Sequence, residues 1–247
     1  MKYKKIRLGV NIDHIAFIKN ARDTLYPNLV DAVMVAEKAG ADLITIHLRE
    51  DRRHIQDKDA LEIRQCAKVL NFEMAHTKEM IDFAIKLKPD FCCIVPEKRE
   101  EKTTEGGLNL EALNVDEFDK FKQNIIKLSD SGIKTSLFID PSKKSVKLAH
   151  ELGAPIIELH TGHYANAFNT ITEFERLEDL KNASEYADSL GLLVNAGHGL
   201  NYENIGQICE INQINELNIG HAIIADSVFL GLKDAIEKMI SIISNCD

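Results

Sequence analysis

The sequence predicts an α/β fold of the (β/α)8 (TIM) barrel class, and three observations support this prediction. Eight short runs rich in apolar and β-branched residues are spaced along the 247 residues. Segments with helical periodicity lie between the runs, and Gly or Pro marks several turns that precede a strand. Nearly continuous apolar strands that alternate with helices indicate a parallel sheet covered on both faces. Eight such units in about 250 residues match the size of this barrel.

The eight predicted strands occupy residues 7–13, 43–48, 72–75, 91–96, 134–140, 156–162, 192–197 and 217–224. Helical periodicity is clear in two of the connections. One apolar stripe runs from Val228 to Ile243, and another consists of Met80, Phe83, Ala84 and Leu87. The connections after strands four and six are longer than usual and predict extra helical segments there. The chain contains no linker or low-complexity tract, so we expect a single domain over residues 1–247.

The composition argues against several classes of function. A hydrophobic content of 45% is ample for a core, and a formal charge of −9 disfavours binding to nucleic acid. No run reaches the roughly 18 apolar residues of a membrane span, and polar residues interrupt the segment after the basic MKYKK start. The five cysteines lack CxxC spacing, and Cys92 and Cys93 lie in an apolar run, which is typical of reduced core thiols. A cytoplasmic protein is therefore expected.

Polar residues gather where the strands of such a barrel end. Barrel enzymes build their active sites at the carboxyl ends of the strands, so residues there are candidates for chemistry. One histidine at such a place is more often structural than catalytic, but that interpretation weakens when histidines recur at several strand ends. The candidates are Asn11, Asp13, His14, His47, Arg49, Glu73, Glu158, His160, His198, Gly220 and His221.

Glu73 is the most informative acidic candidate, because it lies inside a short apolar strand. Its side chain must face either the barrel axis or the surrounding helices. Burial of a carboxylate without a partner is costly, and it raises the pKa toward the range that suits a general base. A structural ion pair is the competing interpretation.

Glycine-containing motifs follow the last two strands, NAGHGLN at 195–201 and LNIGHAI at 217–223. Glycines there let backbone N–H groups approach an anion closely, as in the phosphate sites common in this fold. Either motif alone could serve an ordinary turn, but together they predict a phosphorylated ligand. The segment TTEGG at 103–107, in the long fourth connection, suggests a lid that excludes water, although a plain surface loop would look similar.

A family resemblance extends from about residue 6 to residue 240. The segments GVNIDHIAFIKNAR, ITIHLREDRRHI, FEMA, VPEKREEKTTEGG, SLFID, IELHTG, NAGHGLNYENI and ELNIGHAII resemble, in this order, the pyridoxine 5′-phosphate synthase family. The resemblance implies condensation of 3-amino-2-oxopropyl phosphate with 1-deoxy-D-xylulose 5-phosphate to give pyridoxine 5′-phosphate, inorganic phosphate and water. It also implies a barrel that uses no metal or organic cofactor and assembles as a homo-octamer.

The resemblance further implies roles for individual residues. His47 and Glu73 would accept protons, His198 would donate one, and Glu158 would assist catalysis. The aminoketone phosphate would be held by Asn11, Arg22, Gly199, Gly220 and His221. The deoxyxylulose phosphate would contact Asp13, His14, Arg49, His54 and Thr103.

The chemistry expected of these residue types agrees with that assignment. Imine formation, loss of phosphate and ring closure are dominated by proton transfers, which several acid and base groups around one cavity can provide. The substrate supplies its own amine, so no lysine is needed as a Schiff-base nucleophile. No lysine lies within the proposed strand ends, and Lys98, just beyond strand four, is the nearest.

Three features need separate interpretations. Between Arg49 and His54, we expect Glu50, Asp51, Arg52 and Arg53 to form ion pairs that hold the loop in shape. His163 occupies a position where the family varies. Asp226 lies near the predicted phosphate site, and because its charge would repel a phosphate, we expect it to point outward and cap the last helix.

Two alternative functions fit parts of the same pattern. A metal-dependent barrel epimerase or hydrolase could use Asp13, His14, His47, His160 and His198 as ligands for zinc or manganese. The neighbouring arginines would repel a cation, and the chain has no HxH or HExxH spacing. A non-catalytic module that binds a phosphorylated ligand would keep the glycine motifs, but it would have no use for His47 and Glu73.

Overall fold

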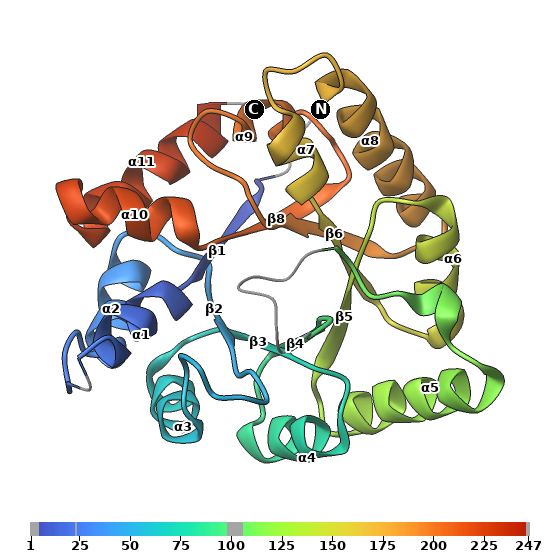
Figure 1. The fold of residues 1–247 in the computed structure, drawn as a ribbon, viewed down its shortest axis with the longest axis horizontal. Coiled ribbons are helices and arrows are strands. Elements are labelled where there is room, and N and C mark those ends of the chain that lie inside the picture. Colours follow the sequence, from blue (N-terminus) through green and yellow to red (C-terminus); the bar gives the residue numbers. More distant parts are fainter. Residues whose placement is uncertain (1–4, 23, 98–105, 246–247) are drawn as a thin grey trace.

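The structure is a computed structural model and describes residues 5–22, 24–97 and 106–245. Its eight parallel strands follow one another around a closed barrel, and β1 pairs with β8 to complete the ring (Figure 1). The predicted TIM-barrel fold is therefore confirmed. The strands are β1 (Arg7–Asn11), β2 (Leu43–His47), β3 (Leu70–Met74), β4 (Phe91–Ile94), β5 (Lys134–Ile139), β6 (Ile156–His160), β7 (Leu193–Gly197) and β8 (Ile214–Ile219).

Helices surround the strands on the outside of the barrel (Figure 1). The segments predicted after strands four and six include the short 3₁₀ helix η1 and the short helix α7, whereas α1 and α10 were not predicted as separate helices. The helices are α1 (Asp13–Asn20), α2 (Leu29–Lys38), α3 (Asp57–Cys66), α4 (Lys78–Leu87), η1 (Leu110–Ala112), α5 (Val115–Asp130), α6 (Lys143–Leu152), α7 (Gly162–Ala167), α8 (Glu173–Ser189), α9 (Ile205–Cys209), α10 (His221–Leu230) and α11 (Leu232–Asn245).

Local sequence explains how α4 begins and which face it buries. The Thr77 hydroxyl accepts a hydrogen bond from the backbone N–H of Met80 and so satisfies a donor that the helix itself leaves unpaired. Met80, Ala84 and Leu87 are buried at helical spacing, as the sequence predicts. The stripe packs the helix against the barrel, where Phe83 stacks on Phe72 of β3 with ring centroids 5.8 Å apart.

The strand register decides which side chains meet inside the barrel. His47 on β2 is paired with Glu73 on β3, and Glu158 on β6 is paired with Asn195 on β7. Side chains alternate along a strand, so Phe72, next to Glu73, faces outward toward α4. In this register, paired polar residues of adjacent strands point to the same face of the sheet and lie at the same height along the barrel axis.

The boundaries of the first and last strands were wrong in the sequence prediction. β1 ends at Asn11, so Asp13 and His14 belong to α1. β8 ends at Ile219, Gly220 is the N-cap of α10, and His221 is the first residue of that helix. The apolar run after His221 was read as strand because a short buried run does not distinguish strand from helix by periodicity.

The predicted stripe from Val228 to Ile243 spans two helices. Gly231, with φ of +82°, separates α10 from α11, and Val228 is 70% exposed. A single helix was predicted because the spacing of the apolar residues does not reveal the change of direction at this glycine. Asp226 lies in the middle of α10 and pairs with Lys238 of α11 at 2.7 Å. The prediction that it caps the last helix is therefore wrong.

Cys66, Cys92 and Cys93 are free thiols. Cys92 and Cys93 are buried in β4, Cys209 is buried in α9, and Cys66 is partly buried in α3. The burial of Cys92, Cys93 and Cys209 matches the prediction of cysteines in the core. Among the helices of the described residues, none is long and apolar enough to cross a membrane.

Candidate active site

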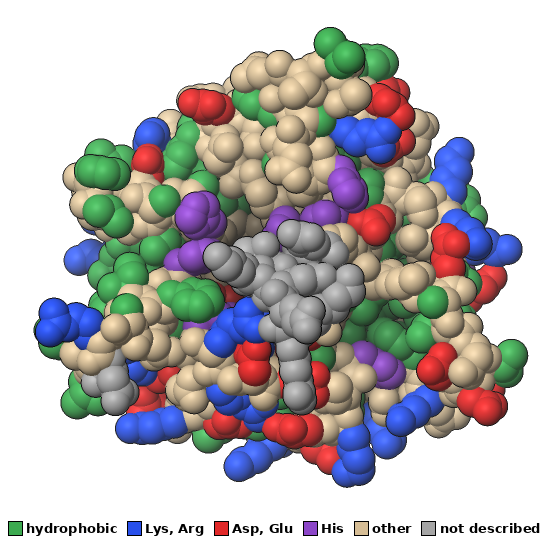
Figure 2. Space-filling view, in the orientation of Figure 1, with side chains coloured by type: hydrophobic (Ala, Val, Ile, Leu, Met, Phe, Trp, Pro, Cys, Tyr) green, Lys and Arg blue, Asp and Glu red, His purple; other side chains and the backbone are tan. Residues whose placement is uncertain are grey.

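A cavity of about 510 Å³ opens at the carboxyl ends of the strands. Histidine side chains gather around this mouth of the barrel (Figure 2). The cavity brings together residues from β3, β6 and the segments that follow β1, β7 and β8. The predicted site residues that line it are Asn11, His14, Glu73, Glu158, His198, Gly199, Gly220 and His221.

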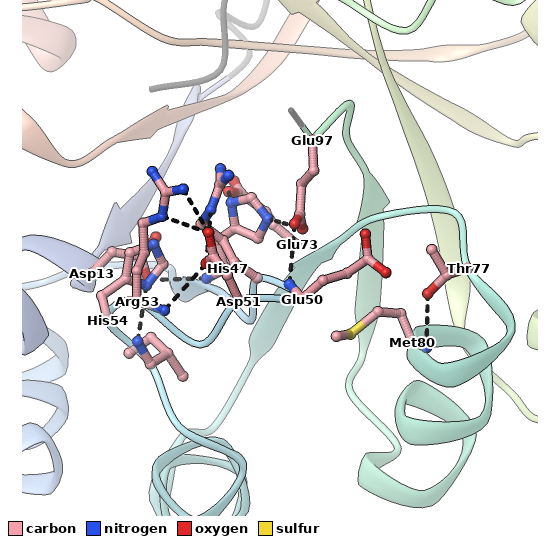
Figure 3. A network of polar contacts seen from close by, with 12 residues as sticks. Asp13, His47, Glu50, Asp51, Arg53, His54, Glu73, Thr77, Met80 and Glu97 are labelled. Carbon is pink, nitrogen blue, oxygen red and sulfur yellow. Dashed lines mark hydrogen bonds and ion pairs between the residues drawn. The ribbon is translucent and has the colours of Figure 1, made fainter. Parts of the chain in front are cut away.

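His47 lies beside this cavity between two carboxylates (Figure 3). Its Nε2 is 2.8 Å from Oε1 of Glu97, and its Nδ1 is 3.9 Å from Oε2 of Glu73. Its backbone N–H donates to Oδ1 of Asp13 at 3.0 Å, which fixes the end of β2. The imidazole is therefore held in one orientation with a carboxylate near each ring nitrogen.

Glu97 is a site residue that was not predicted from the sequence. It follows the end of β4, where its Oε2 also accepts the backbone N–H of Glu50 at 3.1 Å. Burial raises the pKa of Glu97, but the hydrogen bond and charge of His47, the N–H of Glu50 and the charge of Arg49 together outweigh it, so the net shift is downward. Its place just after a strand end is a weak signal, but the sequence does not show that this carboxylate contacts His47.

Two acids, Glu158 buried and Glu73 partly buried, face the barrel interior with raised pKa values. Burial raises the pKa of Glu73 well above its usual value, and the charges of Glu158 and Asp13 add to the shift. Burial also raises the pKa of Glu158 to about 8, and the charge of Glu216 adds to this effect. Both acids therefore hold protons more tightly than free carboxyl groups do, which suits a role in proton transfer.

Polar side chains along the barrel axis hold Glu158 in place. The amide of Asn218 donates to Oε2 of Glu158 at 2.8 Å and to Oε1 of Glu216 at 3.2 Å. Glu216 also lies 3.3 Å from the guanidinium of Arg7. Asn218 and Glu216 were not predicted from the sequence, because alternation within an interior strand does not tell which face carries function.

His198 and His160 form a second group on the opposite side of the cavity. Their ring centroids lie 5.1 Å apart, and Nδ1 of His160 is 3.0 Å from Oδ1 of Asp140. Burial lowers the pKa of His198 to about 4, and the charge of His160 adds to the effect. A Cβ on Gly162 would lie 2.4 Å from Nε2 of His160 and 3.2 Å from Cδ2 of His198, so this glycine lets the two rings approach.

The glycine motifs bring backbone groups to the cavity, as predicted. Gly220 caps the amino end of α10, and His221 begins that helix beside Asn11 and Gly199 in the cavity wall. A Cβ on Gly220 would lie 3.0 Å from Cβ of Asn11, so the chain could not come as close with another residue. Free N–H groups and the dipole at a helix amino end attract anions.

The remaining predicted ligand contacts differ in how close they lie to the cavity. Arg49 and His54 are buried in the loop after β2, where Nδ1 of His54 is 4.0 Å from Oδ1 of Asp13. Burial lowers the pKa of His54 to about 3, so this imidazole is neutral at pH 7. Arg22 is exposed in the turn after α1 and is absent from the cavity wall formed by the described residues. Thr103 and the rest of the predicted lid up to residue 105 lie outside the described residues.

Ion pairs hold the loop between Arg49 and His54 in shape, as predicted for three of its four charged residues. Arg53 pairs with Asp51, and Arg52 pairs with Asp57 at 3.1 Å and with Glu79. Hydrogen bonding to Arg53 lowers the pKa of Asp51 to about 2. Glu50 contributes instead its backbone N–H, which donates to Glu97.

The five residues predicted as ligands of a metal-dependent barrel enzyme do not all lie close to one another. Within the described ranges, His, Cys, Asp and Glu donor atoms lie within 4.8 Å of one another in two groups. One group contains Asp13, His47 and Glu73, and the other contains Asp140, His160 and His163. His14 and His198 belong to neither group, so the five predicted metal ligands do not form one centre.

The profile of the family described as pyridoxal phosphate biosynthesis protein PdxJ matches residues 8–245. The chain belongs to the PdxJ family. A relative named pyridoxine 5′-phosphate synthase in Idiomarina loihiensis is 52% identical to it over 241 residues, which are 97% of this chain and 98% of that protein. A relative of the same name in Coxiella burnetii (strain Dugway 5J108-111) is 50% identical over 240 residues, again 97% of this chain and 98% of the relative. The family resemblance found in the sequence is confirmed.

Solved structures of more distant proteins share the fold of this PdxJ family member. A mutant tryptophan synthase α-subunit from the hyperthermophile Pyrococcus furiosus aligns with a TM-score of 0.64 at 11% identity, over 99% of this chain and 100% of that one. Orotidine 5′-monophosphate decarboxylase from Methanocaldococcus jannaschii, complexed with the inhibitor BMP, aligns with a TM-score of 0.64 at 14% identity, over 97% of this chain and 99% of that one. At such identities, the likeness concerns the fold alone.

Proposed function

We propose that this chain is a pyridoxine 5′-phosphate synthase, a transferase that condenses 3-amino-2-oxopropyl phosphate with 1-deoxy-D-xylulose 5-phosphate. The products are pyridoxine 5′-phosphate, inorganic phosphate and water. One observation carries the proposal beyond family membership. His47 is held between Glu73 and Glu97, and Glu73 lines the same cavity as the glycine motifs. A proton-transfer centre beside an anion site is what condensation of two phosphorylated substrates requires.

His47 and Glu73 are the proposed proton acceptors. Glu97 holds the His47 ring and stabilises the positive charge that the ring gains when it takes a proton. Glu73 has a raised pKa, so it binds a proton more strongly than an ordinary carboxylate and is a better base once it is ionised. Together they can remove protons from carbon and nitrogen atoms of the condensing substrates.

His198 is the proposed proton donor, and its lowered pKa requires an explanation. At a pKa of about 4 the ring is neutral at pH 7 in the substrate-free protein. Negative charge brought in by phosphate groups raises the pKa of a nearby imidazole. His198 then acquires its proton only when substrate is present, while Glu158, held by Asn218, is proposed to assist from the barrel axis.

The two phosphates are proposed to bind on different sides of the cavity. The aminoketone phosphate lies near the amino end of α10, where the residues are Asn11, Gly199, Gly220 and His221, and Arg22 is assigned to it by resemblance. The deoxyxylulose phosphate is assigned to the region of α1 and the loop after β2, with Asp13, His14, Arg49, His54 and Thr103. The steps are condensations and proton transfers, so the proposal requires no metal or organic cofactor.

The test of this function is incubation of the purified full-length chain with both phosphorylated substrates. Formation of the pyridoxine chromophore and release of phosphate in equal amounts support the proposal. Omission of either substrate is the control and must abolish both signals. Folded protein that yields neither signal with both substrates present would contradict the proposal. A Glu73→Gln variant that binds substrate with full turnover would instead contradict the role of Glu73.

A homo-octamer in the cytoplasm is proposed as the working form. Apolar side chains at the end of α10 support a contact between copies, because Val228 is 70% and Phe229 is 88% exposed. The free buried thiols of Cys92 and Cys93 are compatible with a reducing compartment. Light scattering coupled to size-exclusion chromatography tests the assembly, and an elution at the mass of one chain would refute it.

A further inference from the structure

A second, smaller cavity lies outside the carboxyl ends of β5 and β6, and the proposed reaction does not use it. Its volume is about 300 Å³. Asp140, directly after β5, and His160, at the end of β6, meet there with His163 of α7. Tyr164 and Arg176 also line the cavity. His163 is the residue that the sequence singled out and that the proposed function leaves without a role.

The three acidic and imidazole side chains in this cavity converge. One donor atom from each of Asp140, His160 and His163 lies within 4.8 Å of the other two. Nδ1 of His160 is 3.0 Å from Oδ1 of Asp140, and the rings of His160 and His163 have centroids 5.3 Å apart. His160 is buried, Asp140 is half-buried and His163 is exposed, so the group is anchored on one side and open to solvent on the other.

We propose that Asp140, His160 and His163 bind one divalent transition-metal ion of the zinc class. Two imidazoles and one carboxylate are a ligand set that zinc accepts in sites that keep a fourth position open. With metal–ligand bonds of about 2.0 to 2.1 Å and tetrahedral angles, ligand atoms lie about 3.3 Å apart. The 3.0 Å between His160 and Asp140 is already close to that separation.

Backbone and packing contacts hold two of the ligands in place before any ion arrives. Oδ1 of Asp140 accepts the backbone N–H of Gly107 at 2.9 Å, and a Cβ on Gly107 would lie 2.2 Å from the backbone N of Asp140. The ring of His160 packs edge-on against Phe138, with centroids 5.3 Å apart. Only His163 has to be fixed on binding, which limits the entropic cost of forming the site.

Arg176 lies in the same cavity and could oppose a cation, but acidic neighbours offset its charge. Its guanidinium pairs with Asp179 at 3.0 Å and also with Glu175. Asp179 itself lines the cavity and adds negative charge near the proposed ion. The local balance is therefore compatible with a bound cation.

The test is calorimetric titration of chelator-treated full-length protein with zinc chloride. Wild-type protein is expected to bind one zinc ion per chain at this site. A His163→Gln variant is expected to bind at least about 100-fold more weakly, since loss of an outer-shell partner alone already costs about 10- to 100-fold. Asp140→Asn keeps an oxygen that can accept the Gly107 N–H but loses the charge, and it is expected to weaken binding as well.

Two matched variants make the result specific. His150→Gln removes an exposed histidine at the end of α6 and is expected to bind zinc as the wild type does. Glu73→Gln alters the other convergent group, and the Asp140 site is expected to remain in it. Wild-type protein without saturable zinc binding would overturn the proposal, as would undiminished binding in His163→Gln or loss of the only tight site in Glu73→Gln. Zinc binding is measured without substrates, so its failure is distinguishable from failure of the proposed synthase activity.

Discussion

Glu97 provides the sharpest test of how the site holds His47. The change is Glu97→Gln, which keeps the shape of the side chain but removes its charge. In the structure, Oε1 of Glu97 lies 2.8 Å from Nε2 of His47, and Oε2 accepts the N–H of Glu50 at 3.1 Å. The glutamine can keep one of these contacts, but it cannot be a charged acceptor for the imidazolium that forms when His47 takes a proton.

The size of the effect follows from the value of a charge-assisted hydrogen bond. Such a bond contributes about 1.5 to 3 kcal/mol, and each 1.36 kcal/mol is about tenfold in rate. A stabilisation that is greatest in the transition state lowers kcat rather than raising KM. We therefore expect kcat to fall about 10- to 150-fold, with both KM values within about threefold of the wild type, because Glu97 is not in the cavity wall formed by the described residues.

The assay is the initial rate of pyridoxine 5′-phosphate formation at several concentrations of each substrate. Glu79→Gln is the matched control, because Glu79 is an exposed acid that pairs with Arg52 of the same loop and has no contact with His47 among the described residues. It should retain kcat within about twofold. A Glu97→Gln enzyme with more than half of the wild-type kcat would refute the positioning role. So would a loss that appears only in KM.

Three further predictions address the remaining site residues. Glu73→Gln is expected to lower kcat at least about 100-fold, while the substrate affinity measured by calorimetry stays within a few-fold of the wild type. Equal losses of kcat and of substrate affinity would contradict a purely catalytic role. Glu158 has a pKa of about 8 in the fold, against an ordinary 4.5, so its contribution to stability is full below about pH 4.5 and is lost as the pH rises toward 8. Urea unfolding of Glu158→Gln should therefore show a shallower loss of stability between pH 5 and 8, by up to about 1.4 kcal/mol per pH unit, and an unchanged slope would count against the raised pKa. Gly162→Ala places a methyl group 2.4 Å from Nε2 of His160, so kcat should fall about tenfold or more while the far-UV circular dichroism stays unchanged; normal turnover would show that the close approach of His160 and His198 does not matter.

Much of the barrel could be predicted because eight short apolar runs alternate with segments of helical periodicity, which is typical of parallel strands buried on both faces. β2 and β6 are buried at every position, and the polar residues at their ends, His47 and His160, stood out against that background. The end of β8 was misjudged because Gly220 starts a helix whose first residues are as apolar as a strand. The run from Ala222 to Ile224 looks the same in either case until the backbone direction is known.

Glu97 shows the limit of reading a site from one sequence. It lies after Pro96 in a charged segment, where a carboxylate normally signals a solvated loop. The pairing of β4 with β3 and of β3 with β2 places the end of β4 near β2, and Glu97 reaches across to His47 (Figure 3). Such a contact joins residues that are 50 positions apart, and no local pattern reports it.

The buried polar groups along the barrel axis make this protein less stable than a barrel with an apolar interior would be. Asn218 joins two buried acids, Glu158 and Glu216, where most side chains of a barrel would be aliphatic. Replacement of a buried polar group by an apolar one of similar volume is often neutral or stabilising. Laboratory evolution that selects for thermal stability and not for catalytic activity should therefore replace Glu158 and its partners early. The resulting barrels would be more stable and catalytically inactive.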